Sequence, residues 1–75
     1  MNIEYNGISY DNRHGGPFDR GAADNYYRRL FRPHYFAGAT YQSEEIIPPK
    51  GTPEYEAYCA GYDFNEESGD KKDWG

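Results

Sequence analysis

The first ten positions alternate between apolar and polar residues on both sides of an Asn-Gly pair. Ile3 and Tyr5 precede this pair, and Ile8 and Tyr10 follow it. Such alternation is typical of a strand with one buried face, and Asn-Gly readily adopts the positive φ angles of a type I′ turn. We therefore expect a β-hairpin in which these four side chains share one face.

A helical pattern follows the glycine-rich loop after this hairpin. Asp19 is a suitable residue to cap the start of a helix. Apolar side chains then recur at intervals of three and four residues, at Ala23, Tyr26, Tyr27, Leu30 and Phe31. The spacing predicts an amphipathic helix of about three turns. Pro33 should end this helix, because the residue before a proline avoids the helical conformation.

Two further elements are expected in the second half of the chain. Residues 39–47 have moderate β character, which favours a strand that could pair with the hairpin in a three-stranded antiparallel sheet. A second helix should begin at Thr52-Pro53-Glu54, which combines a capping hydroxyl, a proline and an acid in the first turn. The apolar stripe of this helix is Tyr55, Tyr58, Cys59, Tyr62 and Phe64.

These elements predict a small single α+β domain over residues 1–67 and a polar C-terminal tail over residues 68–75. Chains of this length bury only about 60% of the surface that their unfolded form exposes, so extra support is expected. Cys59 is the only cysteine, which excludes an intramolecular disulfide, and the histidines show no ligand spacing for a metal. Self-association as a homo-oligomer is the remaining common device.

The composition changes the expected core, because the chain has nine Tyr, four Phe and one Trp but few aliphatic residues. Tyrosine rings can fill an interior, but each hydroxyl must find a hydrogen-bond partner or reach water. We expect tyrosines that surround the core with their hydroxyls at the surface. Such a surface suits recognition of another macromolecule.

The formal net charge is −5, and residues 51–75 hold the excess, with two Lys against seven Asp and Glu. No long apolar run predicts a transmembrane helix, and the first thirty residues lack the pattern of a signal peptide. The sequence therefore predicts a cytoplasmic protein with no membrane partner.

Residues 26–36 interleave three arginines and a histidine with five aromatic residues. Arginine neutralises phosphate and aromatic rings stack on unpaired bases, so this composition suits a contact with RNA. The predicted partner-binding residues of this segment are Tyr27, Arg28, Arg29, Arg32, His34 and Tyr35. The alternative is that the rings are core and the arginines are solvated or paired with the acidic second helix. The negative net charge favours that alternative.

The second predicted binding surface is acidic and lies on the second helix. Its residues are Glu54, Glu56, Asp63, Glu66 and Glu67. Carboxylates in this number could imitate a nucleic-acid backbone and occupy a basic groove on a host protein. The alternative is an ordinary solvated helix face that keeps the protein in solution.

No catalytic, cofactor-binding or metal-binding residue is predicted. Asp63, Asn65 and Glu67 alternate as in a calcium loop, but glycine is missing from the sixth position and Trp74 occupies the twelfth. Cys59 lies on the apolar stripe with no histidine near it in sequence, which favours a small buried thiol over a nucleophile. The chain is therefore expected to be a non-enzyme without a cofactor.

Three segments together resemble small uncharacterised proteins of tailed phages, including marine phages. They are Gly-Pro-Phe-Asp-Arg-Gly-Ala-Ala-Asp-Asn-Tyr-Tyr-Arg at 16–28, Pro33-His34-Tyr35, and Ala-Tyr-Cys-Ala-Gly-Tyr-Asp at 57–63. The likeness spans about residues 15–75. It implies a phage origin and carries no established activity.

A fainter similarity reaches the ribosome modulation factor group. It rests on Arg20-Gly21-Ala22-Ala23, on Pro33-His34-Tyr35 and on Ala60-Gly61-Tyr62, which follow the order of that family. The similarity implies binding to ribosomal RNA. That family is basic, whereas this chain is acidic and has an additional N-terminal hairpin.

The leading hypothesis is a small phage-type accessory protein that binds and modulates a host protein through a tyrosine-rich and acidic surface. One alternative is an RNA- or ribosome-binding module that uses residues 26–36. Another is a minor structural or assembly component of the phage particle.

Overall fold

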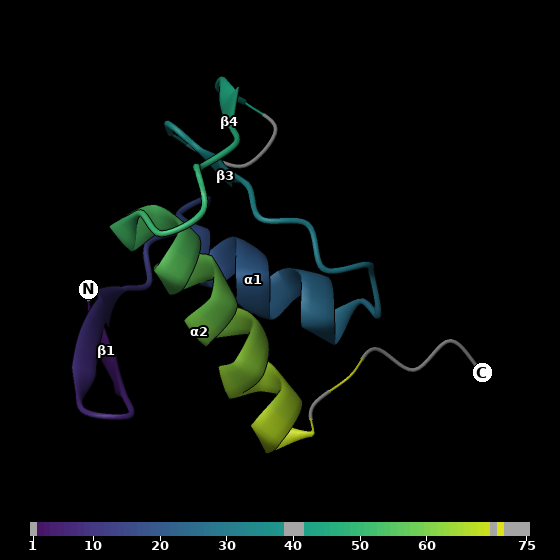
Figure 1. The fold of residues 1–75 in the computed structure, drawn as a ribbon. Helices are drawn as coiled ribbons and strands as arrows, with labels where there is room; N and C mark the ends of the chain where they lie inside the picture. Colours follow the sequence, from purple (N-terminus) through teal and green to yellow (C-terminus); the bar gives the residue numbers. More distant parts are fainter. Residues whose placement is uncertain (1, 39–41, 70, 72–75) are drawn as a thin grey trace.

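The computed structural model of the chain describes residues 2–38, 42–69 and 71. Its elements in chain order are β1 (Asn2–Tyr5), β2 (Ile8–Asp11), α1 (Pro17–Tyr26), β3 (Tyr35–Phe36), β4 (Glu45–Ile46) and α2 (Pro53–Ser68). The two helices cross at the centre, with the β1–β2 hairpin beside them and the β3–β4 pair at one end (Figure 1). The chain is a small single α+β domain, as the sequence predicts.

The N-terminal hairpin forms with the predicted register. β1 pairs antiparallel with β2 and places Ile3 opposite Tyr10. The turn residues Asn6 and Gly7 have φ angles of 52° and 80°, and positive values at both positions are what a type I′ turn requires. The hairpin prediction is therefore confirmed.

Aromatic contacts fix the hairpin to both helices. The ring of Tyr5 lies edge-on to Phe64 of α2, with 5.8 Å between centroids, and Tyr10 packs on Phe18 of α1 at 5.5 Å. The Tyr5 hydroxyl donates a hydrogen bond to the Glu67 carboxylate. This bond, with a smaller effect of burial, raises the pKa of Tyr5 to about 12.

The strands form two separate two-stranded sheets, β1–β2 and β3–β4. In the second sheet, Tyr35 lies opposite Ile46 and Phe36 opposite Glu45. The prediction of a three-stranded sheet is therefore wrong. Of the segment predicted as a strand, Glu45–Ile46 is extended, and residues 39–41 lie outside the described part of the chain.

The loop after the hairpin occupies the place where a third strand was expected. Arg13 donates to the carbonyl of Phe36 at 2.8 Å and to the carbonyl of Gly38 at 3.2 Å. The N–H of Phe36 donates to the carbonyl of Gly15 at 2.8 Å. Because this loop satisfies the backbone of β3, the sheet is not continued into the hairpin.

Helix α1 begins earlier than predicted. Gly16 is its N-cap and Pro17 its first residue, a position that the fixed φ angle of proline favours. Asp19 lies in the first turn, and its carboxylate accepts the N–H of Gly15 at 2.9 Å. Asp19 thus stabilises the helix start from inside the first turn and is not the cap.

Helix α1 also ends earlier than predicted. The N–H of Arg28 donates to the carbonyl of Asn25, and that of Arg29 to the carbonyl of Asp24 at 2.8 Å. Arg28 has a φ angle of 60°. This pattern is a Schellman motif, in which a left-handed residue stops the helix. The predicted continuation towards Pro33 is therefore wrong.

Helix α2 begins as predicted. Thr52 is the N-cap, and its hydroxyl accepts the N–H of Tyr55 at 3.3 Å. Gly69 ends the helix with a φ angle of 73°. The buried residues are Ala57, Tyr58, Ala60 and Gly61. The predicted aromatic stripe is thus only partly buried, and small residues form much of the packed face.

The two helices are in backbone contact at a pair of glycines. A Cβ atom at Gly21 would lie 2.1 Å from the carbonyl oxygen of Tyr58, and one at Gly61 would lie 2.0 Å from that of Phe18. Both distances are far below van der Waals contact, so any larger residue would push the helices apart. Glycine at these positions allows the close helix crossing.

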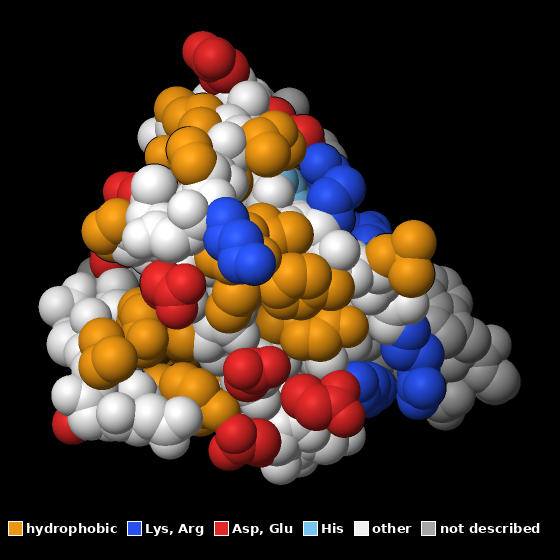
Figure 2. Space-filling view, in the orientation of Figure 1, with side chains coloured by type: hydrophobic (Ala, Val, Ile, Leu, Met, Phe, Trp, Pro, Cys, Tyr) orange, Lys and Arg blue, Asp and Glu red, His pale blue; other side chains and the backbone are white. Residues whose placement is uncertain are grey.

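The interior mixes apolar and polar side chains. The buried apolar residues are Phe18, Phe36, Ala57, Tyr58 and Ala60, and the buried polar residues are Arg20, Asp24, Asn25 and His34. Figure 2 shows hydrophobic side chains over the helix crossing, carboxylates below them, and most of the visible Lys and Arg along the right edge. A local basic surface is therefore present although the net charge of the chain is negative.

Candidate binding surface

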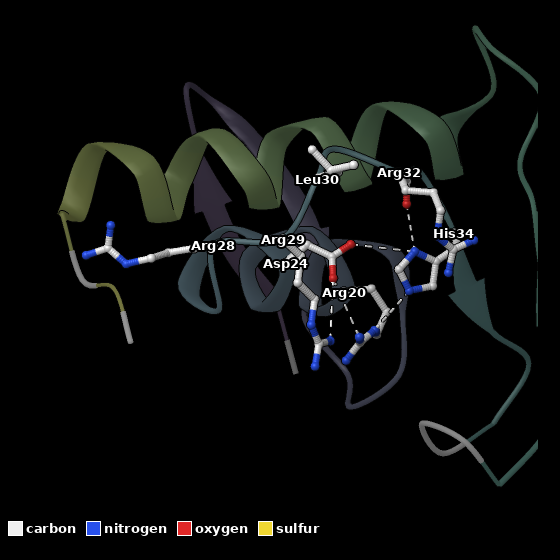
Figure 3. Close-up of a pocket in the computed structure, with 7 residues that line it drawn as sticks. All are labelled: Arg20, Asp24, Arg28, Arg29, Leu30, Arg32 and His34. Atoms are coloured by element: carbon white, nitrogen blue, oxygen red, sulfur yellow. Dashed lines mark hydrogen bonds and ion pairs between the residues drawn. The ribbon is translucent and has the colours of Figure 1, made fainter. Parts of the chain in front are cut away.

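An open pocket of ≈ 510 Å³ lies between α1 and the segment that follows it. It is lined by Arg20, Asp24, Arg28, Arg29, Leu30, Arg32 and His34. We call it the arginine pocket, because four of these residues are arginines. Figure 3 shows the guanidinium groups of Arg20 and Arg29 beside the Asp24 carboxylate, while Arg28 points away from them.

Asp24 is the centre of a buried polar network beneath this pocket. Its carboxylate accepts a hydrogen bond from the Tyr58 hydroxyl. The carboxylate oxygens also lie 3.7 Å from Arg20 Nη2, 3.8 Å from Arg29 Nη1 and 3.7 Å from His34 Nδ1. A buried carboxylate is tolerated only with such partners, because burial strongly disfavours an unpaired charge. Asp24 therefore lies against three of the side chains that line the pocket, Arg20, Arg29 and His34.

Tyr58 joins this network to the loop after α1. Its hydroxyl donates to Asp24 and accepts the backbone N–H of Arg32 at 3.1 Å. Burial and the hydrogen bond to Asp24 raise the pKa of Tyr58 well above its usual range. The hydroxyl therefore stays protonated and remains a donor.

His34 lies in the interior with 3% of its surface exposed. Its Nε2 lies 3.2 Å from Arg20 Nε, and its Nδ1 lies 2.7 Å from the carbonyl of Arg32. Because arginine can only donate, Nε2 must accept, and the ring is the neutral tautomer with its proton on Nδ1. The structure thus places this predicted contact residue inside the domain, where it orients Arg20.

The loop at residues 27–32, hereafter the 27–32 loop, exposes three large side chains. Leu30 is 88% exposed, Phe31 46% and Tyr27 38%. One edge of the loop is nevertheless anchored, because the Phe31 ring packs edge-on against Tyr58 at 5.4 Å and Tyr62 at 5.2 Å. These side chains are therefore not the buried helix face that their spacing predicts.

The arginines of this loop have defined neighbours. The guanidinium group of Arg29 lies 5.0 Å from the centre of the Tyr27 ring. Arg32 donates to both carboxylate oxygens of Glu45, at 3.2 and 3.3 Å, and this pair lowers the pKa of Glu45. Arg32 is thus paired with a residue of β4, whereas the sequence suggested an acidic residue of α2.

The predicted acidic residues Glu54, Glu56, Asp63, Glu66 and Glu67 are all exposed on α2. Two of them hold other elements. Glu66 accepts from Lys71 Nζ at 2.6 Å and from Asn25 Nδ2 at 2.8 Å, and these bonds lower its pKa. Glu67 accepts from Tyr5. Part of the acidic surface therefore stabilises the packing of α2 against α1 and the hairpin.

The structure brings part of the predicted arginine and aromatic set together. Tyr27, Arg28, Arg29 and Arg32 are exposed, and the three arginines line the same pocket. Tyr35 is half-buried on β3. The sequence reasoning missed Arg20 and Asp24, although their spacing of four residues places them on one helix face.

Cys59 is half-buried on α2. Burial, with the nearby carboxylates of Glu56 and Asp63, raises the pKa of its thiol. A protonated thiol is a weak nucleophile and a poor metal ligand. Among residues 2–38, 42–69 and 71, no three His, Cys, Asp or Glu side chains are grouped so that they could hold a metal ion.

Within the described part of the chain, neither helix combines the length and the apolar character needed to cross a membrane. Comparison of the chain with protein-family models, with curated proteins and with solved structures found no match. The resemblances to small tailed-phage proteins and to the ribosome modulation factor group therefore stay predictions from the sequence.

Proposed function

We propose that this chain is a small non-enzymatic binding protein that docks onto and modulates another protein, with the 27–32 loop as its main contact surface. The observation that carries the proposal is the exposure of Leu30 between two arginines and beside Phe31. Aromatic residues and arginine are enriched in the centres of protein interfaces, where they contribute most of the binding energy. We place this activity in the cytoplasm of a phage host.

The way the loop is held supports this proposal. The Schellman motif fixes its start, and the hydrogen bond from the Arg32 N–H to Tyr58 fixes its end. Phe31 packs on α2 between these points and leaves Leu30 pointing outward. A loop held in its bound conformation loses little entropy when a partner binds. Leu30 can therefore act as a pre-positioned anchor.

Strain at the start of the loop also supports a functional role. Arg28 adopts the left-handed conformation, which is costly for any residue with a Cβ atom. Glycine is the usual residue at this position of a Schellman motif. An arginine retained there is consistent with a side chain that is needed for contact, since strained residues are common at functional sites.

The acidic residues of α2 support a second contact with the same partner. Glu54, Glu56 and Asp63 are exposed. A partner with a basic surface would match α2, and an apolar pocket next to that surface would match the 27–32 loop. Attraction between the basic surface and the carboxylates of α2 would increase the association rate.

The test is affinity capture from host lysate, with nuclease, using the wild-type chain and the Leu30→Ser variant. Ile47→Ser is the matched control, because Ile47 is 60% exposed outside the loop. We expect a discrete protein that is retained by the wild type and the control and lost by Leu30→Ser. Equal capture by all three chains, or capture that nuclease abolishes, would contradict the proposal.

The second candidate is an RNA- or ribosome-binding module, which the four arginines of one pocket favour. In that case, binding to ribosomes or RNA should weaken steeply with salt, because each arginine–phosphate contact releases counterions. The double variant Arg28→Ala/Arg29→Ala should abolish it. Weak salt dependence, or full binding by the double variant, would exclude this candidate.

A further inference from the structure

We propose that the outer edge of β2 binds an extended segment of another protein, which pairs with Ser9 as an added strand. An apolar side chain of this segment enters the groove between β2 and the start of α2, and a lysine or arginine lies beside it. The groove shares no residue with the 27–32 loop. The inference therefore goes beyond the docking function proposed above.

The backbone of Ser9 faces away from β1. Tyr5 and Ile8 flank the turn and lie opposite each other, and the next pair is Glu4 with Ser9. A type I′ turn joins its first and fourth residues by a hydrogen bond, and hydrogen-bonded pairs alternate with non-bonded pairs along an antiparallel ladder. The N–H and carbonyl of Ser9 therefore point to the outer edge of β2. In the described part of the chain, neither group bonds to another segment.

A groove of ≈ 210 Å³ follows this edge. It is lined by residues 9–11 of β2, by Pro17 of α1, and by Pro53 and Ala57 of α2. Consecutive side chains of a strand point to opposite faces, so a groove that touches all three β2 residues runs along the strand edge. β1 occupies the other edge. The groove thus lies where an added strand would form its hydrogen bonds.

The wall of the groove selects an apolar side chain. Pro17 and Pro53 have no N–H group, and Ala57 is a buried apolar residue. Arg13 also lines the groove, but its guanidinium group donates to the carbonyls of Phe36 and Gly38. In strand addition, backbone hydrogen bonds provide affinity, and pockets for alternate side chains provide specificity. Ser9 and this wall supply both.

The charge at the rim selects a basic segment. Glu54 lines the groove and is exposed, and its carboxylate forms no ion pair with any residue that the structure describes. A lysine or arginine beside the apolar residue would pair with it. A second copy of this chain is a poorer occupant, because a symmetric contact between two β2 edges brings the same acidic rim to both sides, and like charges repel.

The probe is the acetylated and amidated peptide Thr-Val-Lys-Val-Thr, whose β-branched residues favour the extended conformation. The control peptide has the same sequence with methyl groups on its three central backbone nitrogens, which removes the donors that strand pairing requires. Binding to the 15N-labelled full chain is followed by NMR titration at the amide of Ala57. Sedimentation of the chain without peptide measures self-association.

Two proline variants test the strand edge. Ser9→Pro removes an N–H at the outer edge of β2, and the control Glu4→Pro removes the N–H of its cross-strand partner, which points to the opposite edge. Neither N–H belongs to the ladder between the strands, and proline is tolerated at such edge positions. Nuclear Overhauser contacts between Tyr10 and Phe18 report whether the hairpin keeps its place.

Two further variants keep the test valid if proline disrupts the hairpin. Glu54→Gln removes the charge at the rim, and Glu56→Gln is the control on an exposed α2 residue outside the groove. Leu30→Ser should bind the peptide like the wild type, because Leu30 belongs to the other surface.

We expect Ser9→Pro and methylation of the peptide each to weaken binding at least about tenfold, and Glu54→Gln to weaken it about threefold. Glu4→Pro and Glu56→Gln should bind like the wild type. Absence of binding at millimolar peptide, equal binding of the two peptides, or no effect of Glu54→Gln would each overturn the inference. Self-association that Ser9→Pro abolishes, without peptide binding, would also overturn it, because the occupant would then be a second copy.

Discussion

The hydroxyl of Tyr58 on α2 donates a hydrogen bond to the carboxylate of Asp24 on α1. Tyr58 is fully buried, and Asp24 is 3% exposed. The same hydroxyl accepts the N–H of Arg32 at 3.1 Å. One oxygen atom therefore links the two helices, the wall of the arginine pocket and the end of the 27–32 loop.

Replacement of this hydroxyl should destabilise the domain. Tyr58→Phe removes one hydrogen-bond donor from the buried Asp24 carboxylate, which costs about 1–3 kcal/mol. Chemical denaturation monitored by circular dichroism measures the loss. Tyr62→Phe, on a half-buried tyrosine of the same helix, is the control and should be milder. Equal stability of Tyr58→Phe and the wild type would show that the hydroxyl does not link the helices.

The helix crossing should not tolerate a methyl group. Gly21→Ala would place Cβ 2.1 Å from the carbonyl oxygen of Tyr58, so the helices must separate. We expect a loss of about 3 kcal/mol or more in the free energy of unfolding. Gly38→Ala is the control, because its nearest contact would be Ser43 at 3.4 Å. Similar melting temperatures for the two variants would be inconsistent with the crossing described above.

Arg28→Gly should stabilise the domain while weakening partner capture. Glycine relieves the left-handed strain at φ 60° but increases the entropy of the unfolded chain, so we expect a net gain of about 0.5–1 kcal/mol. Thermal unfolding measures this gain. Arg29→Gly is the control and should not stabilise. A variant that gains no stability would contradict the prediction that strain at Arg28 outweighs the contacts of its side chain.

The ion pair of Arg32 and Glu45 should respond to acid. The pair lowers the pKa of Glu45, so its contribution to stability is present above the unfolded-state pKa and is lost as pH falls through the folded value. In Arg32→Gln, the Glu45 pKa should rise towards its ordinary value, which carboxyl-detected NMR titration can follow. Arg13→Gln is the control, because Arg13 binds the backbone carbonyls of Phe36 and Gly38 and not the Glu45 carboxylate. An unchanged Glu45 titration would exclude the pair in solution.

The sequence predicted elements whose signals are local. Asn6-Gly7 sets the hairpin turn, and Thr52 with Pro53 sets the start of α2. Each signal acts through the conformation of one residue or one capping hydrogen bond, within a few positions of the chain. These interactions do not depend on what packs against them, so pattern and propensity were sufficient.

The end of α1 could not be predicted in this way. Arg28 takes the left-handed position that glycine normally marks, so the sequence carries no stop signal before Pro33. The helix ends at Tyr26 because Phe31 packs on α2 and the Arg32 N–H donates a hydrogen bond to the Tyr58 hydroxyl. These tertiary contacts outweigh the local preference, and they move Leu30 from a predicted core position to the surface.

The candidate site was likewise only partly predictable from the sequence. Composition alone identified Arg28, Arg29 and Arg32 as a basic and aromatic segment. Which of these charges converge, and on what, depends on Asp24 and on the glycines that bring α1 and α2 into backbone contact.

Local signals were thus enough to predict the hairpin turn, the cap of α2 and the kinds of side chain available for contact, because these depend on neighbours along the chain. The burial of His34, the exposure of Leu30 and the shared pocket of the arginines became known from the folded structure. The reason is that burial and charge pairing depend on residues far apart in sequence, such as Asp24 and Tyr58, that folding brings together.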